Sequence, residues 1–498
     1  MSTSQPVPEP RSVLIRAPAS RSYVEILRST VLIGGTSAVA LLIGLVRTKA
    51  MAVLLGPAGF GLMGALTAIA DLARSVADLG VNASGVRQIA EAVASGDEVR
   101  IATTATVLRR LSLALGLCGA AVLVAASPLV ARATFGDGAH VGAVALLSLA
   151  VLLRLVSDGQ GALLQGTRRI ADLARFNVYG TAFGVVAAVA LVWWLRTDGV
   201  APAIVAIAAA SLMTSWWYAR KVPIRRIALS GTGFRRESVA LIRLGVAFLA
   251  SATLMMAAAW LVRLIVIRHD GLAMAGLYQS AWTIGGLYVG LVLQAMGSDF
   301  YPRLVGAIGD HGTANRLVDE QAQVSLLLGG PGVIATIALA PLVLGLLYSP
   351  EFVPATETLR WICLGMAVRI VTWPVGFVVV AKSRPGAFVA IELAWATINV
   401  ALSWLLVQRH GPVGAAIALF GSYLVHAAVL YPVVRRMTGF RWSAQTRRTL
   451  LLQGFAVAAA FAAWRWLEPT TAATVSALLL AATLAAATRT LLRRVRGR

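Results

Sequence analysis

Residues 176–219 read FNVYGTAFGVVAAVALVWWL-RTDG-VAPAIVAIAAASLMTSWWYA, and this stretch decides the fold class. Each of its two apolar halves is 20 residues long and has no charged side chain, which is what a membrane-spanning helix requires. Only 196-RTDG-199 separates the halves, and the basic segment 220-RKVPIRR-226 follows directly. The pattern predicts two helices that cross a membrane and meet at a very short loop.

The rest of the chain has the same character. Of its 498 residues, 58% are hydrophobic and 13% are charged, and the mean hydropathy is +0.79. A soluble protein of this length could not keep so much apolar side chain away from water. The net charge of +23 does not indicate nucleic-acid binding, because the basic residues stand between apolar stretches, as in the cytoplasmic loops of membrane proteins.

About fourteen segments have the roughly 20 mainly apolar residues that one crossing needs. They begin near Leu27, Phe60, Ile101, Val141, Phe176, Val200, Val239, Leu272, Val324, Leu359, Gly386, Pro412, Leu450 and Thr471. The sequence therefore predicts an all-α polytopic membrane protein with about 14 transmembrane helices.

The loops predict the orientation. Basic residues gather in 167-TRRIADLAR-175, 220-RKVPIRR-226, 435-RRMTGFRWSAQTRR-448 and the tail 493-RRVRGR-498, whereas several opposite loops, such as 409-RHGP-412, are very short. Because lysine and arginine accumulate on the cytoplasmic side, we expect a multi-pass protein of the cell inner membrane with both termini in the cytoplasm. Residues 1–25 lack a long apolar run and are predicted to form a disordered cytoplasmic tail.

Short matches recur along the chain at nearly one offset, for example Gly61-Leu62 with Gly276-Leu277. Matches this short also arise by chance. If they mark a repeat, six spans separate equivalent positions, so both halves have the same orientation. We then expect six-helix lobes at 26–220 and 239–436 around a central cavity, a basic linker at 221–238 and an extra helix pair at 447–492.

Charged residues inside spans are expensive in lipid and usually mark a pathway. The candidate substrate-binding residues are Arg47, Lys49, Arg263 and Arg369; the candidates for coupling or ion pairing are Asp71, Arg74, Asp78, Arg154, Asp158 and Glu392. Arg369 has no acidic residue three or four positions away, and Glu392 has no obvious partner within its own helix. A lone buried carboxyl group of this kind could carry a proton.

Structural roles compete for the same residues. Arg74 with Asp78, and Arg154 with Asp158, are four positions apart and can pair on one helix face. Arg47 and Lys49 lie late in the first span, where their side chains can reach the outer interface, and Arg263 has the same escape. His426 stands alone in a helix and is interpreted as a packed residue.

Unpaired arginine facing a cavity suits a phosphorylated ligand, because the guanidinium binds phosphate bidentately and keeps its charge. A diphosphate-linked lipid has such a headgroup. We find no Walker loop, GxSxG elbow, HExxH motif or CxxC pair, so the sequence indicates a transporter rather than an enzyme and predicts no cofactor or metal site.

Six stretches in order carry a resemblance to a known family: 53-VLLGPAGFGLM-63, 163-LLQGTRRIADLARFN-177, 300-FYPRLVGAIGD-310, 361-WICLGMAVRI-370, 377-FVVVAKSR-384 and 411-GPVGAAIALFGSYLV-425. Together they resemble the Wzx-type oligosaccharide flippases of the multidrug/oligosaccharidyl-lipid/polysaccharide exporter superfamily. The resemblance implies two six-helix lobes, a cationic cavity and outward flipping of an undecaprenyl-diphosphate-linked glycan in polysaccharide biosynthesis, with help from the proton-motive force.

The resemblance also implies site residues. Lys49 and Arg263 match basic residues of the family, Arg369 resembles a lysine-type position and Glu392 a matching acid, while 44-GLVR-47 resembles a Gly-x-Val-Arg pattern of lipid II flippases. The two C-terminal spans exceed the twelve of close relatives; they are an accessory pair or a partner-docking element.

Two other functions remain open. A proton- or sodium-coupled multidrug/cation antiporter of the same superfamily would have an acidic or neutral cavity, and the arginine excess counts against it. A membrane-embedded glycan polymerase or ligase would need a substantial outer loop with catalytic groups, and the outer connections here are short. We expect a monomer whose partners are the lipid bilayer and the lipid-linked glycan, with polysaccharide polymerase machinery as a further candidate partner.

Overall fold

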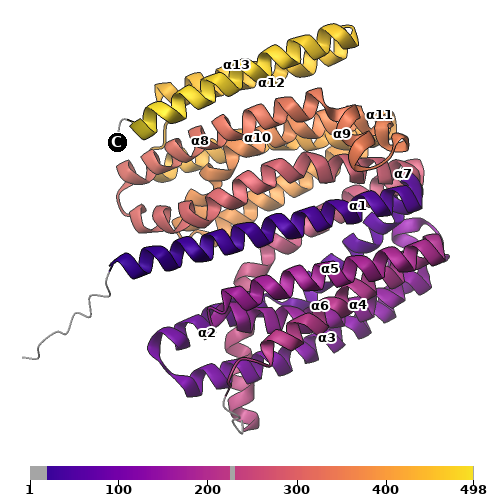
Figure 1. Cartoon of the computed structure of the whole chain (residues 1–498), viewed down its shortest axis with the longest axis vertical. Helices are drawn as coiled ribbons and strands as arrows, with labels where there is room; N and C mark the ends of the chain where they lie inside the picture. The colour runs from indigo at the N-terminus through magenta and orange to yellow at the C-terminus, as the bar shows by residue number, and fades with distance from the viewer. Residues whose placement is uncertain (1–18, 225–229, 497–498) are drawn as a thin grey trace, which may run out of the picture.

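The structure is a computed structural model that describes residues 19–224 and 230–496, and all regular structure in these ranges is helical (Figure 1). The elements are α1 (Ala19–Asp78), α2 (Val81–Ser95), α3 (Glu98–Phe135), α4 (Val141–Gly166), α5 (Ile170–Leu195), η1 (Arg196–Gly199), α6 (Val200–Ala219), α7 (Gly231–Ala307), α8 (His311–Ala338), α9 (Ala340–Leu347), η2 (Pro350–Ala355), α10 (Thr356–Ala381), α11 (Pro385–Thr438), α12 (Ala444–Trp466) and α13 (Pro469–Arg496). The predicted all-α fold class is confirmed.

Three of these helices are too long for one crossing, and each bends at a glycine. Gly56 in α1 (φ 61°), Gly271 in α7 (φ 83°) and Gly411 in α11 (φ 56°) have a positive φ, which glycine adopts without steric cost. Each bent helix therefore consists of two arms. Together with α3–α6, α8, α10, α12 and α13, these arms make fourteen long helical rods within the described ranges. This number agrees with the predicted spans.

Hydropathy supports the assignment of eleven of these fourteen rods as membrane spans. In the part of the chain that the structure describes, eight helical stretches are long and apolar enough to cross a membrane. Three of them, Leu41–Asp78, Ile170–Ala219 and Pro385–Thr438, contain a bend or a short 3₁₀ turn and so hold two rods each. The chain is an integral membrane protein.

Unusual backbone conformations recur at one spacing along the chain. Positive φ angles occur at Gly56 and Gly271, at Arg168 and Ser383, and at Arg196 and Gly411, and the separation in sequence is identical in all three pairs. Such a conformation is uncommon outside glycine. The same separation relates Gly61 to Gly276, so the repeat that the sequence suggested reappears in the backbone, and chance matching does not explain it.

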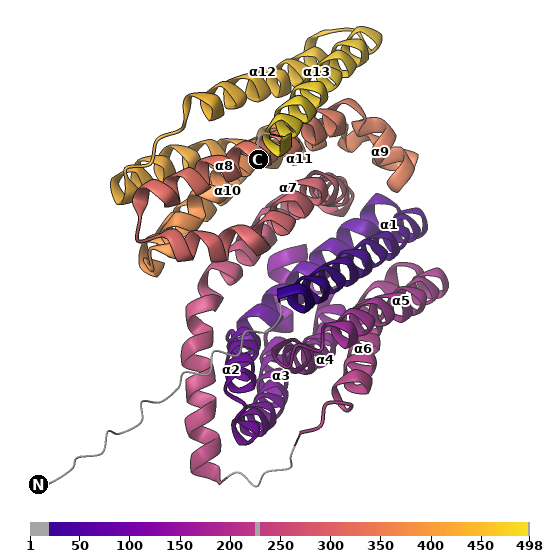
Figure 2. The ribbon, with the colours of Figure 1, turned by 60° about the vertical axis from the view of Figure 1, so that its left-hand side comes forward.

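The helices form two groups. Figure 2 shows α1–α6 on one side and α8–α13 on the other, with α7 between them. Contacts between Gly56 and Glu351, and between Asp270 and Gly411, bring the three bends together at one end of the bundle, here called the kink end. The start of α1 and the end of α13 lie at the opposite end, the terminal end (Figure 1).

Caps decide where several helices begin at the terminal end. The side chains of Asp97, Ser230, Asp310 and Ser443 each accept a hydrogen bond from a backbone N–H in the first turn that follows. Because Ser230 caps α7, this helix starts inside the segment 221–238 that was predicted to be a linker. Likewise α1 starts at Ala19, directly after Pro18, within the predicted tail 1–25, whose residues 1–18 lie outside the described ranges.

Aromatic side chains close the kink end between the two groups. Phe60 of α1 meets Tyr348 and Phe352, from either side of the start of η2, with ring centroids 5.3 and 5.5 Å away. All three are at most 3% exposed. Deeper in the bundle, Gly61 of α1 lies against the backbone of α7 at Gly276, so no side chain separates these two helices there.

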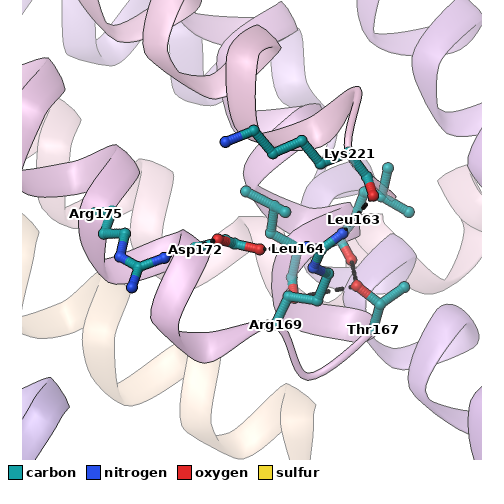
Figure 3. A network of polar contacts seen from close by, with 7 residues as sticks. All are labelled: Leu163, Leu164, Thr167, Arg169, Asp172, Arg175 and Lys221. Atoms are coloured by element: carbon teal, nitrogen blue, oxygen red, sulfur yellow. Dashed lines mark hydrogen bonds and ion pairs between the residues drawn. The ribbon is translucent and has the colours of Figure 1, made fainter. Parts of the chain in front are cut away.

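A polar network fixes the turn between α4 and α5 to the end of α6 (Figure 3). Arg169 donates to the Lys221 carbonyl oxygen at 2.6 Å and pairs with Asp172 at 2.7 Å. Asp172 is 8% exposed and also pairs with Arg175 at 3.6 Å. Because a buried carboxylate needs such partners, the network holds the backbone just after α6 in place.

The C-terminal pair α12–α13 is attached mainly to α8. The Asp319 carboxylate of α8 accepts hydrogen bonds from the Ser443 backbone N–H (3.0 Å) and the Thr446 hydroxyl (2.9 Å) at the start of α12. Near the other end of α12, the Arg360 guanidinium of α10 lies 4.3 Å from the ring centre of Trp464. The pair is thus anchored at both ends.

Candidate functional site

Two adjoining cavities lie between α7, α10 and α11. The larger has a volume of about 330 Å³ and the smaller about 40 Å³. Both are lined by Met255, Arg369, Trp395 and Tyr423, so together they form one site, here called the C-group cavity. Arg369 interacts with the Tyr423 hydroxyl. Within the described ranges, Arg369 makes no ion pair with a carboxylate.

Arg263, from the first arm of α7, lines the smaller part of the C-group cavity. Its Nε donates to Gln279 Oε1 at 2.6 Å and its Nη1 to the Ala259 carbonyl at 3.1 Å. Gln279 in turn donates to the Thr283 hydroxyl at 3.2 Å. These neutral partners orient the guanidinium and leave its charge uncompensated by any ion pair in the described chain, so it remains available for an anion.

Glu392 lines the larger part of the cavity and has a partner that its own arm does not supply. Its Oε1 lies 3.7 Å from His426 Nε2, which comes from the second arm of α11. The bend at Gly411 brings the two arms together. The interpretation of His426 as a packed residue was incomplete, because it also faces the only acidic residue that lines this cavity among those described.

The charges of α1 and α4 form a different pattern from the one predicted. Arg74 pairs with Asp158 of α4 at 2.9 Å, while Asp78, at the end of α1, accepts a hydrogen bond from Asn82 of α2. The same-helix pairs Arg74–Asp78 and Arg154–Asp158 do not reach ion-pair distance in the described structure. The expectation of intrahelical pairing was wrong because α4 packs directly on α1 and offers Arg74 a partner from the neighbouring helix.

Asp71 lies where the charges of both groups converge. It is within electrostatic range of Arg47, on the first arm of α1, and of Arg263, on α7. Arg154 also lies near Arg47. Arg154 and Arg369 are related by the spacing of the backbone repeat, so each group contributes an arginine at an equivalent place.

Lys49 lies apart from the other predicted substrate-binding residues. Its Nζ donates to the Gly345 carbonyl of α9 at 3.4 Å, which places the ammonium at the kink end. The alternative that Lys49 reaches towards an interface therefore fits the structure better than a place in the cavity.

A third cavity, of about 710 Å³, lies between α12 and the helices α8, α10 and α11. Its lining is apolar apart from a few groups such as Gln453 and Thr372. It borders the face of α10 that carries Val368 and Val371, next to Arg369 on the same helix. Thr372 of α10 lines both this cavity and the C-group cavity, so the two cavities lie on adjoining faces of α10.

Sequence reasoning missed several residues that line the C-group cavity, namely Trp395, Asn399 and Tyr423, and it also missed Gln279, which accepts a hydrogen bond from Arg263. The nitrogens Trp395 Nε1 and His426 Nδ1 are buried and have no hydrogen-bond partner among the described residues. A polar residue inside an apolar span, such as Asn399, was the available signal. Nothing in the sequence showed which helices face one another.

Comparison with protein families gives one match that spans most of the chain. The family described as "Polysaccharide biosynthesis protein" matches residues 50–357. Among curated proteins, the lipid III flippase of Escherichia coli (strain K12) is 22% identical over 395 residues, which cover 77% of this chain and 92% of that protein. The lipid III flippase of Shigella flexneri gives the same values.

Solved structures share the fold. The lipid II flippase MurJ in an inward closed conformation has a TM-score of 0.69 at 12% identity and covers 94% of this chain and 100% of MurJ. An inward-facing MATE multidrug transporter of the MOP superfamily has a TM-score of 0.66 at 17% identity and covers 80% and 95%. The C-terminal pair starts at Ala444, with α12, and takes up the rest of the chain. A match that covers 94% of the chain therefore includes part of this pair.

Proposed function

The chain belongs to the polysaccharide biosynthesis protein family, and on that basis we propose that it is a flippase for a lipid-linked oligosaccharide. Its substrate is an undecaprenyl-diphosphate-linked glycan, moved from the inner to the outer leaflet of the cell inner membrane for a surface polysaccharide such as O-antigen. Curated relatives named lipid III flippase and a structural neighbour named lipid II flippase support this class of substrate.

The observation that carries the proposal is the excess of positive charge in the C-group cavity, where two arginines stand against one carboxylate, Glu392, which faces His426. Arg263 and Arg369 both line it, and neither pairs with a carboxylate in the described chain. Arginine stays charged under all physiological conditions and forms two parallel hydrogen bonds to a phosphate. A diphosphate would compensate both guanidinium groups.

The remaining lining suits the other parts of such a lipid. Trp395 and Tyr423 offer aromatic faces, and the unpartnered Trp395 Nε1 offers a hydrogen-bond donor, which are groups that bind hydroxyl-rich ligands. The apolar cavity beside α12 offers a surface for the undecaprenyl chain. This arrangement gives α12 a role in the same process.

The direction of transport also has a physical basis. Outward movement of negative charge from an inside-negative cell is favourable by about 2.3 kcal/mol per charge per 100 mV. The basic terminal end, with Arg169, Lys221 and Lys382, is assigned to the cytoplasm on the positive-inside rule. In this scheme the chain acts as a monomer without cofactor or metal, catalyses no covalent step, and delivers glycan to polymerase machinery on the far side.

The competing function is a proton- or sodium-coupled multidrug/cation antiporter. The MATE transporter among the structural neighbours favours it, because its fold is similar. Two arginines and one glutamate line the cavity, so its net positive charge repels an organic cation, and charge therefore favours the flippase.

The test is transport in liposomes that carry a lipid-linked oligosaccharide in one leaflet. Wild type is compared with Arg263→Ala and Arg369→Ala, with Arg465→Ala as the matched control, because Arg465 is an exposed arginine at the kink end that pairs with Glu357. A hydrogen bond to a charged group contributes about 1.5–3 kcal/mol, so each cavity variant should flip about ten- to hundredfold more slowly. The control should match wild type.

Three results would count against the proposal in different ways. If both cavity variants still flip the lipid at the wild-type rate, the protein is a flippase but the C-group cavity is not its substrate site. Loss of flipping in Arg465→Ala as well would indicate general damage by arginine removal. No flipping by wild type, together with proton-linked efflux of an organic cation, would establish the antiporter instead.

A further inference from the structure

A fourth cavity lies away from the helices that form the C-group cavity. Its volume is about 570 Å³, within the range of roughly 300–1,000 Å³ typical of ligand pockets. It is formed by α3, α4 and α6 near the terminal end, with α3 and α6 on either side of α4. Figure 2 shows these three helices on the side of the N-terminal group that faces away from α8–α13.

Three arginines line this pocket, and no acidic residue of the described chain does. Arg109 and Arg110 come from α3 and Arg220 from the end of α6, with Gln160 of α4 as a further polar group. Arg109 and Arg110 have apolar residues, serine or threonine at the positions three and four away on their helix. Within the described chain, neither forms an ion pair or a hydrogen bond to another side chain.

Adjacent unpaired arginines on a long apolar helix are unfavourable, because the two charges repel and α3 supplies no counter-charge. Both side chains are exposed on the pocket side. The pocket therefore holds the positive charges of Arg109 and Arg110 without an acidic partner from the described chain. A bound anion would supply the missing counter-charge.

The third arginine of the pocket, Arg220, is held in position by two tryptophan rings. Its guanidinium lies 3.7 Å from the ring centre of Trp217 and 4.7 Å from that of Trp216. The hydrogen bond from Arg169 to the Lys221 carbonyl fixes the backbone directly after it (Figure 3). Exposed tryptophans at the end of a span are typical of the membrane–water interface, which places the pocket at the level of lipid headgroups.

We propose that this pocket is a binding site for an anionic phospholipid of the inner leaflet, whose phosphate is held by Arg109, Arg110 and Arg220. The apolar part of the lining, including Leu113, Val156 and Leu163, would contact the upper part of its acyl chains. Basic pockets between transmembrane helices on the cytoplasmic side bind headgroups of this kind. The site is separate from the proposed transport cavity and does not depend on which substrate is transported.

The test is lipid binding to the purified full chain, measured by native mass spectrometry with cardiolipin, phosphatidylglycerol or phosphatidylethanolamine. The variant Arg109→Ala/Arg110→Ala removes one adjacent pair of arginines. The matched control Arg447→Ala/Arg448→Ala removes another exposed pair, near the start of α12, that lines none of the cavities described above. An arginine near an anionic lipid surface contributes about fivefold to binding, so the double variant should bind anionic lipid about thirtyfold more weakly.

Further variants keep the test decisive. Arg109→Lys/Arg110→Lys should retain most of the binding, because charge is preserved, and Arg220→Ala should weaken it by about fivefold from a different helix. Equal binding of phosphatidylethanolamine, or equal loss in the Arg447→Ala/Arg448→Ala control, would overturn the site in favour of nonspecific association. Displacement of the lipid by millimolar inorganic phosphate would show a site for a soluble anion instead.

Discussion

Gly61 of α1 and Gly276 of α7 bring the backbones of these two helices into direct contact, and this contact gives a test of how the kink end closes. A Cβ atom added at Gly276 would collide with the carbonyl oxygen of Pro57 and would lie 2.8 Å from its carbonyl carbon and 3.0 Å from the amide nitrogen of Gly61. Optimal contacts between carbon atoms are about 3.5–4.0 Å long. Both neighbours are backbone atoms, so Gly276→Ala must push the two arms apart by roughly 1 Å.

The size of the effect follows from this displacement. Overpacking a close contact typically costs about 1–3 kcal/mol, which corresponds to a shift of about 5- to 150-fold towards conformations in which the kink end is open. The matched control is Gly290→Ala on the same arm of α7, where an added Cβ would meet nothing within 4 Å. Its helix-propensity gain of up to about 1 kcal/mol should stabilise the protein slightly.

The assay is labelling of Ala65→Cys, in a Cys118→Ser/Cys363→Ala background that removes both native thiols, by a membrane-impermeant maleimide. Ala65 is 1% exposed, on the arm of α1 that carries Gly61. Gly276→Ala should raise its labelling rate within the range of about 5- to 150-fold, and Gly290→Ala should leave it unchanged. If the two variants label and melt alike, the glycine contact does not hold α1 and α7 together and the reasoning is refuted.

Two further predictions concern the charges inside the bundle. Arg74→Ala and Asp158→Ala, combined in a double-mutant cycle, should show a coupling energy of about 1–2 kcal/mol in thermal stability. The reason is that the two paired side chains are only 23% and 33% exposed. Additive effects of the two substitutions would show that the pair does not connect α1 to α4. If the Glu392 carboxyl group carries the coupling proton, Glu392→Gln should abolish the response of flipping to an imposed pH gradient. The control Glu357→Gln, at the kink end, should keep this response. An unchanged response in Glu392→Gln would assign the coupling to another group.

The helices could be predicted from the sequence because the length of each apolar segment matches one membrane crossing. Spans such as 176–195 and 200–219 have one stable solution in lipid, because every backbone N–H and C=O must be satisfied within the segment and a helix does this locally. The predicted starts at Leu272 and Pro412 coincide with bends at Gly271 and Gly411, since a glycine with positive φ ends one rod and begins the next.

Pairing between helices could not be read in the same way. The sequence put Arg74 beside Asp78 and left Glu392 alone, but the structure pairs Arg74 with Asp158 and Glu392 with His426. Intrahelical spacing identifies candidate partners only on one helix, and these partners are brought close by packing between helices or arms distant in sequence. The same limit explains why Tyr423 and Trp395 were missed.

The sequence by itself therefore determined the class of protein, the number of crossings and which residue types stand in the membrane, because each depends on local composition and helical period. Only the tertiary structure decided that Arg263 and Arg369 share a cavity, that Lys49 is engaged with α9, and that Arg109 and Arg110 line one pocket with Arg220. Apolar helices can pack in many ways in lipid, where small side chains and shape set the contacts. Those contacts depend on the whole bundle and not on any one span.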